Sequence, residues 1–92
     1  MIAAVPPPTI VAAVKAAYPR SPIIVAKICR VDGLAFVRLR VRGHESFVAL
    51  QREAGGWRVI WIDGKVLRSV PAAHRDEAAA EVARLRTRCL AP

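Results

Sequence analysis

The chain has 92 residues, which make one domain with a modest hydrophobic core and exclude a second domain. It carries 15 Lys and Arg residues against 7 Asp and Glu residues, and this formal net charge of +8 favours nucleic acid, anionic lipid or acidic proteins as partners. No apolar run approaches the ~20 residues that a membrane-spanning helix needs, so the sequence predicts no transmembrane segment.

The N-terminal part predicts an extended lead followed by a short helix. Residues 1–8 end in three consecutive prolines, which exclude a helix and favour a polyproline conformation. Thr9 is a candidate N-cap for the helix that follows. Ile10, Val14 and Tyr18 recur every four residues, so a helix from Ile10 to Tyr18 presents an apolar stripe to a sheet.

Short turn signals divide the middle of the chain into five predicted strands. The turns are expected at Asp32-Gly33, at residues 43–45, at residues 53–56 and at Asp63-Gly64, and the strands at residues 23–31, 34–42, 46–52, 57–62 and 65–69. Turns this short join antiparallel neighbours, so the sequence predicts a meander sheet of four to five strands.

The alternation of side chains indicates which strand faces are buried. In the strand at residues 34–42 the apolar positions are Val37, Leu39 and Val41, and the basic positions are Arg38, Arg40 and Arg42. The strand at residues 23–31 has Lys27 at one parity and Arg30 at the other, so its buried side stays open. The last long strand places Trp57, Val59 and Trp61 on one face and Arg58, Ile60 and Ile62 on the other. Its two apolar faces predict cover by the last helix or by a second copy of the chain.

Apolar residues at spacings of four, three and four predict a C-terminal helix from Ala72 to Leu90. They are Ala78, Val82, Leu85 and Cys89, and Pro71 precedes the helix where a helix can begin. The elements together predict an α+β fold over residues 9–92. It has an N-terminal helix, a four- to five-stranded antiparallel meander, and a C-terminal helix packed on the sheet.

The two cysteines lie at opposite ends of the predicted domain. Cys29 is near the end of the first strand and Cys89 is on the apolar stripe of the last helix, so packing that helix on the sheet can bring the two sulfurs together. A disulfide would close a long loop, worth ~4 kcal/mol in the chain-entropy model, and would suit an oxidising compartment. The alternative is that both are small buried hydrophobes that never meet.

Short motifs follow one another along the chain in the order Cys29, residues 31–39, residues 50–59, Gly64, Val70-Pro71 and Cys89. In this order the chain resembles small exported bacterial domains of the cystatin-like or NTF2-like type. The resemblance implies a helix before an antiparallel meander, a Gly-Trp turn into a late strand, and a closing helix whose cysteine pairs with the first strand. It implies no activity, because Glu53 stands where the inhibitory QxVxG pattern of cystatins has valine.

A set of arginines on neighbouring strands is the candidate face for a polyanion or a protein partner. Its residues are Arg38, Arg40, Arg42, Arg52 and Arg58. Sheet-based RNA readers place exposed aromatic rings among such cations for base stacking, whereas Trp57 and Trp61 are expected in the core. A solvated face that binds nothing is the alternative interpretation.

Two histidines stand beside carboxylates and are the candidates for a general base. His44 neighbours Glu45 in a predicted turn, and His74 is near Asp76 and Glu77 at the start of the last helix. No nucleophile, carboxylate pair or Gly-rich phosphate loop accompanies either histidine. The sequence therefore predicts no enzyme, no metal site and no cofactor.

The sequence favours a non-catalytic binding or structural module of an exported bacterial protein. It would contact a protein partner, acidic in character, through its basic sheet face and loops. Residues 1–8 lack the features of a signal peptide but resemble the start of a mature exported domain, so a secreted or periplasmic location is expected. The alternative is a small cytoplasmic nucleic-acid-binding protein, remotely similar to RelE or ParE toxins. A homodimer is compatible with both interpretations.

Overall fold

A computed structural model describes residues 9–91, so the extended lead expected at residues 1–8 lies outside the described part of the chain. The elements follow one another as α1 (Ile10–Ala17), β1 (Ile23–Val31), β2 (Leu34–Val41), β3 (His44–Glu53), β4 (Gly56–Ile62), β5 (Lys65–Val66), the 3-10 turn η1 (Ala72–His74) and α2 (Arg75–Leu90). The predicted α+β fold is confirmed: α1 precedes the five strands in the chain and α2 follows them.

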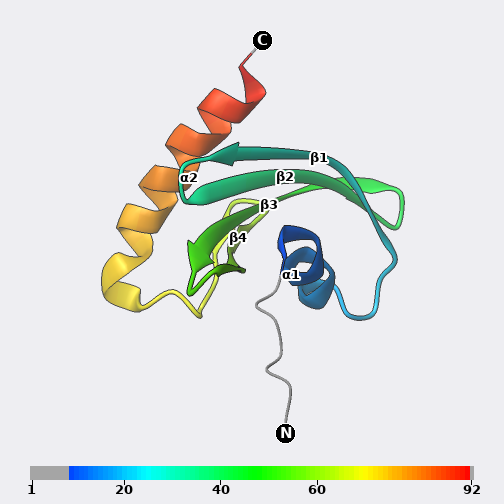
Figure 1. Cartoon of the computed structure of the whole chain (residues 1–92), viewed down its shortest axis with the longest axis horizontal. Helices are drawn as coiled ribbons and strands as arrows, with labels where there is room; N and C mark the ends of the chain where they lie inside the picture. The colour runs from blue at the N-terminus through cyan, green and yellow to red at the C-terminus, as the bar shows by residue number, and fades with distance from the viewer. Residues whose placement is uncertain (1–8, 92) are drawn as a thin grey trace, which may run out of the picture.

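The five strands form one antiparallel meander in the order β1-β2-β3-β4-β5 (Figure 1). The hairpin of β1 and β2 is paired from Val31 opposite Leu34 to Ile23 opposite Val41. The last strand, β5, has only two residues, so the strand expected over residues 65–69 is too long. The chain turns away from the sheet at Leu67, whose carbonyl accepts a hydrogen bond from the Val70 N–H at 3.1 Å.

The two helices lie on opposite faces of the sheet (Figure 1). The strands arch over α1, and we call this face the α1 side and the opposite face the α2 side. The buried core of the α1 side consists of Ile10, Val14, Ala35, Val37, Leu39, Val48, Leu50, Trp57 and Val59. The buried core of the α2 side consists of Phe36, Ala49, Ile60, Trp61, Val70, Val82, Leu85 and Cys89. Each face of the sheet therefore packs against one helix of the same chain.

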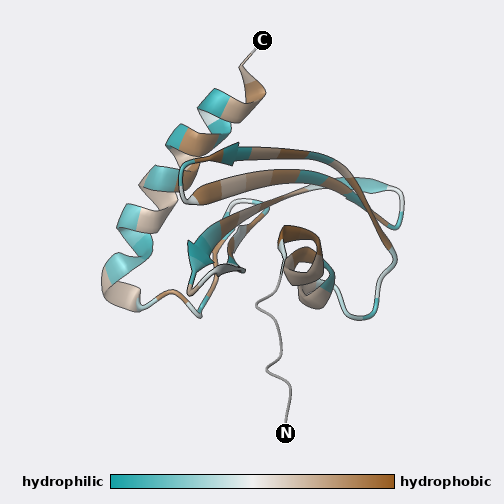
Figure 2. Ribbon diagram, in the orientation of Figure 1, coloured by the Kyte–Doolittle hydropathy of each residue, from teal (hydrophilic) through white to brown (hydrophobic). Residues whose placement is uncertain are grey.

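The two helices differ in how they attach to the sheet. Figure 2 shows that α1 is mostly hydrophobic, whereas hydrophilic and hydrophobic positions alternate along α2. The residues that α2 buries are Val82, Leu85 and Cys89, which belong to the predicted apolar stripe. Because this contact is narrow, the hydrophobic effect holds α2 to the sheet through a small number of side chains.

Side-chain hydrogen bonds define the start of both helices. The Thr9 hydroxyl accepts a hydrogen bond from the Ala12 N–H at 3.1 Å, so Thr9 is the N-cap of α1, as predicted. The Arg75 guanidinium donates to the carbonyls of Val70 and Arg68 at 2.9 and 3.2 Å. These two bonds tie the segment after β5 to the first residue of α2.

Three of the hairpin turns have left-handed backbone at both central residues. Arg42-Gly43, Ala54-Gly55 and Asp63-Gly64 all have positive φ, as type I′ turns require. The turn after β2 therefore needs only two residues and ends before His44. The expectation that residues 43–45 form the turn is wrong for this reason, and His44 and Glu45 belong to β3.

A bulge changes the face to which the side chains of β1 point. Val25 lies opposite Leu39 and Lys27 lies opposite Arg38, which leaves Ala26 as an extra residue on β1. The simple alternation of the strand is broken there. Lys27 therefore shares the α2 side with Cys29, although its odd-numbered neighbour Val25 packs on the α1 side.

A second bulge, in β4, also changes the face to which the following side chains point. Trp61 lies opposite Ala49 and Val59 lies opposite Leu50, which leaves Ile60 as the extra residue. Trp57 and Val59 consequently pack on the α1 side, whereas Ile60 and Trp61 pack under α2. The expectation that Trp57, Val59 and Trp61 share one face is wrong because of this bulge. Of the two covers expected for β4, the last helix covers Ile60.

Candidate functional site

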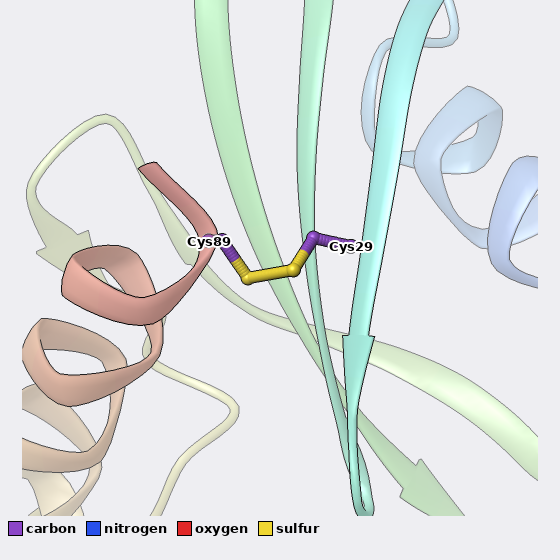
Figure 3. The surroundings of a disulfide bond; sticks show 2 residues. All are labelled: Cys29 and Cys89. Carbon is purple, nitrogen blue, oxygen red and sulfur yellow. A yellow bond between two sulfur atoms is a disulfide. The ribbon is translucent and has the colours of Figure 1, made fainter. Parts of the chain in front are cut away.

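A disulfide joins the outer strand of the sheet to the last turn of α2 (Figure 3). The Cα atoms of Cys29 and Cys89 are 5.9 Å apart, within the usual range for a disulfide, and the bond spans 60 residues of sequence. The predicted pairing is confirmed. The bond fixes the C-terminal end of α2 over β1 and β2, beside Phe36.

The α2 side of the sheet becomes exposed and basic where α2 ends. Phe36 is buried, but Arg38 and Arg40 lie two and four positions farther along β2 and are exposed. Lys27 lies directly opposite Arg38 on β1, and Ile24 lies opposite Arg40, so all four side chains share this side. We call Lys27, Arg38 and Arg40 the basic face.

The basic face has little internal charge compensation. Glu45 on β3 lies opposite Arg40. Among residues 9–91, however, no ion pair within 4.0 Å involves a residue of the basic face. Lys27 and Arg38 face each other as like charges, an arrangement that destabilises an antiparallel pair. The free protein therefore carries a local electrostatic cost at this position.

An open cavity of about 210 Å³ separates the basic face from the end of α2. Lys27 and Arg38 line it together with Phe36, Leu90 and the two cysteines of the disulfide. The Leu90 side chain is 50% exposed, so an apolar surface lies next to two cations. This combination suits a ligand that presents a carboxylate beside an apolar group.

The structure brings together two of the five arginines proposed from sequence and places the other three elsewhere. Arg42 lies in the turn between β2 and β3. Arg52 lies opposite Trp57, a residue of the α1-side core, and therefore points to the α1 side. Arg58 forms an ion pair with Glu53, with 2.5 Å between Nε and Oε2. Arg42, Arg52 and Arg58 do not extend the basic face.

The aromatic side chains near the basic face are packed rather than presented to solvent. Phe47 lies opposite Arg38, is half-buried, and stacks on Phe36 with 5.5 Å between ring centroids. Trp61 is buried 5.9 Å from Phe36. On the other side of the sheet, Arg30 covers Trp57 at 5.1 Å from the ring centroid. The described residues thus offer no exposed ring on the basic face for stacking a nucleobase.

The two histidines considered as general bases lie in separate places. His44 lies opposite Val41 at the start of β3, and Glu45 points to the other side of the strand, so this carboxylate does not orient the His44 ring. His74 lines a cavity of about 260 Å³ together with Arg58, Glu77 and Glu81. In residues 9–91 the structure records no hydrogen bond from either ring. A catalytic role for His44 or His74 stays a prediction.

No helix among residues 9–91 has the length and hydropathy of a membrane-spanning segment. In the same range, the His, Cys, Asp and Glu side chains do not gather in groups of three as a metal site would require. The chain matches no protein-family model, no curated protein and no solved structure.

Lys27 is the member of the basic face that the sequence did not identify. Counting by parity groups it with Val25 and Cys29 and leaves the buried side of the strand open, whereas the bulge at Ala26 brings it opposite Arg38. The signal that identifies it is the pairing register, which depends on the neighbouring strand and is not encoded in the residues of β1 alone.

Proposed function

We propose that this protein is a non-catalytic binding module of an exported bacterial protein and that it holds an acidic protein partner on its basic face. The Cys29–Cys89 disulfide supports export, because structural disulfides persist in oxidising compartments such as the periplasm or the extracellular space. The order of elements agrees with the resemblance to small exported domains. The proposed location is therefore secreted or periplasmic.

The observation that carries the proposal is the placement of Lys27 directly opposite Arg38. This pair costs folding stability and neither residue is within ion-pair distance of a described carboxylate. An acidic partner removes that cost by placing a carboxylate between the two cations. The adjacent exposed apolar surface of Leu90 gives such a partner something to bury, which a phosphate backbone does not require.

The proposal is tested with fluorescent probes of two chemical classes. One probe is an unstructured twelve-residue peptide that contains glutamate and leucine, and the other is a twelve-nucleotide oligo-dT. The test variant carries Lys27→Glu, Arg38→Glu and Arg40→Glu. The matched control carries Arg84→Glu, Arg86→Glu and Arg88→Glu on the exposed surface of α2, which changes the net charge by the same amount.

We expect the peptide to bind the natural protein, and the basic-face variant to weaken this binding about tenfold or more while the α2 control weakens it less. Equal weakening by the two variants would show that binding follows net charge and would contradict the proposal. Tighter binding of the oligonucleotide than of the peptide, with a steep loss on raising salt, would favour the nucleic-acid-binding alternative instead.

A further inference from the structure

β1 is an outer strand with a free edge. It has nine residues and pairs with β2 alone within the described part of the chain, at the outer rim of the sheet (Figure 1). The opposite edge is formed by β5, which has only two residues, and by the part of β4 with which β5 does not pair. A long free edge presents a row of unpaired backbone N–H and C=O groups to any extended segment that reaches it.

The exposed side chains of β1 form contacts for such a segment on both sides of the sheet. Ile24 is 69% exposed and lies on the α2 side, opposite Arg40. Ile28 is 39% exposed and lies opposite Val37, on the α1 side. On the unpaired edge of a sheet, such side chains are available for contact with an added strand.

The bulge limits which part of the edge is regular. Ala26 interrupts the pairing pattern, whereas Lys27 to Val31 continue without a break to the turn. Val31 and Leu34 flank a two-residue turn as a hydrogen-bonded pair. From there, non-hydrogen-bonded and hydrogen-bonded pairs alternate along the two antiparallel strands. Ile28 and Arg30 therefore direct their backbone N–H and C=O groups away from β2. The part of the edge that can pair regularly with an added strand is therefore Lys27–Val31.

The charges of this segment oppose a second copy of the chain as the added strand. β1 contains Lys27 and Arg30 and no acidic residue, and the whole chain has a formal net charge of +8. A second copy would bring the same positive net charge, and its β1 would offer no carboxylate to Lys27 or Arg30. An acidic segment would be attracted to this edge, because its carboxylates on the α2 side would lie beside Lys27 and Arg38.

We infer that an extended acidic segment of the partner adds to Lys27–Val31 of β1 as a sixth antiparallel or parallel strand. This inference rests on the proposed function, since it names how the acidic partner reaches the basic face. Side chains of an added strand alternate between the two sides. The segment therefore carries carboxylates toward the basic face and apolar side chains toward Ile28.

The inference is tested with a nine-residue peptide of alternating valine and glutamate. Its control is the same peptide with N-methyl groups on alternate backbone nitrogens, which keeps the charge and removes the hydrogen bonds of a strand pair. Amide hydrogen exchange of the disulfide-bonded protein is measured with each peptide. Lys27→Glu is compared with Lys65→Glu, which makes the same charge change on the opposite edge strand.

We expect the unmodified peptide to slow exchange at Ile28 and Arg30 about tenfold and the N-methylated peptide to bind about tenfold more weakly. Lys27→Glu should abolish the protection, whereas Lys65→Glu should leave it. Equal binding of both peptides, with loss of both in the basic-face variant, would overturn strand addition and leave the proposed function intact. Failure of both peptides to bind would overturn the proposed function as well. Slow exchange at Ile28 without peptide, together with dimers in sedimentation, would assign the edge to a second copy.

Discussion

Asp63 connects three parts of the molecule through its two carboxylate oxygens. Oδ2 accepts a hydrogen bond from the Ser46 hydroxyl at 2.5 Å, and Oδ1 accepts one from the Phe47 N–H at 2.8 Å. The buried Ser46 hydroxyl also lies 3.1 Å from the Tyr18 hydroxyl, at the C-cap of α1. A single turn residue thus links β3 to the end of α1.

We expect Asp63→Ala to lower the free energy of unfolding by about 1 to 3 kcal/mol, because the buried Ser46 hydroxyl keeps only Tyr18 as a partner and the Phe47 N–H loses its side-chain acceptor. Asp32→Ala is the matched control. Asp32 is exposed like Asp63 and also has positive φ in a hairpin turn, at 53° against 43° for Asp63, but its side chain makes no recorded hydrogen bond. Urea unfolding of the two variants measures the difference. Equal losses would show that the backbone conformation, and not the carboxylate, decides the effect.

Removing the like-charge pair of the basic face should stabilise the protein, in contrast to Asp63→Ala. Lys27→Gln removes one of the two facing cations, so we expect it to raise the free energy of unfolding by roughly 0.2 to 1 kcal/mol while weakening binding of the acidic peptide. The gain should shrink as salt rises, since exposed charges are screened. Thermal unfolding at low and high salt measures it. A destabilised Lys27→Gln protein would show that the pair does not strain the sheet.

At the scale of the elements, α2 depends on the disulfide more than α1 does. It buries three side chains, Val82, Leu85 and Cys89, and the last of these is covalently bonded to β1. α1, in contrast, lies under the arch of the sheet with Ile10 and Val14 buried. Loss of the bond removes the anchor at the C-terminal end of α2 and leaves the α1-side core unchanged.

We therefore expect reduction to lower the free energy of unfolding by about 2 to 4 kcal/mol and to speed amide exchange in α2 more than in β2 or β3. A double variant with Cys29→Ala and Cys89→Ala is the control, because reductant should not change its stability. Urea unfolding and hydrogen exchange, with and without reductant, measure both effects. Uniform faster exchange over the whole chain would contradict the separate anchoring of α2.

The elements themselves could be predicted because their signals are local. β1 spans the residues expected, Thr9 caps α1, and the apolar stripe of α2 contains the residues that it buries. The two bulges could not be predicted, because an extra residue such as Ala26 or Ile60 is defined only against the neighbouring strand. Each bulge changes the face of the side chains beyond it. The bulge at Ala26 brings Lys27 into the basic face.

At the scale of the whole molecule, the two helices cover the two faces of the sheet to different extents. The α1 side is covered where the strands arch over the helix, while α2 leaves the outer part of its side open. The sequence predicted helices that pack on a sheet but did not indicate that they take opposite faces. That arrangement depends on long-range packing, and it decides which arginines are exposed together.

Net charge is a property of the whole molecule, but the proposed function assigns binding to one part of it. The exposed cations of α2, Arg84, Arg86 and Arg88, carry as many charges as the basic face. They lie on a helix surface, where Glu81 is three positions before Arg84 and so is its neighbour on that surface. Under the proposed function, the distribution of charge, rather than its sum, determines where an acidic partner binds.

The most direct test of this claim is chemical-shift mapping of the labelled, disulfide-bonded protein during titration with the twelve-residue acidic peptide. We expect the largest changes at Lys27, Arg38 and Arg40 and at the neighbouring Leu90, with small changes along the exposed surface of α2. Largest changes at Arg84, Arg86 and Arg88, or changes spread evenly over all cations, would contradict a partner site on the basic face.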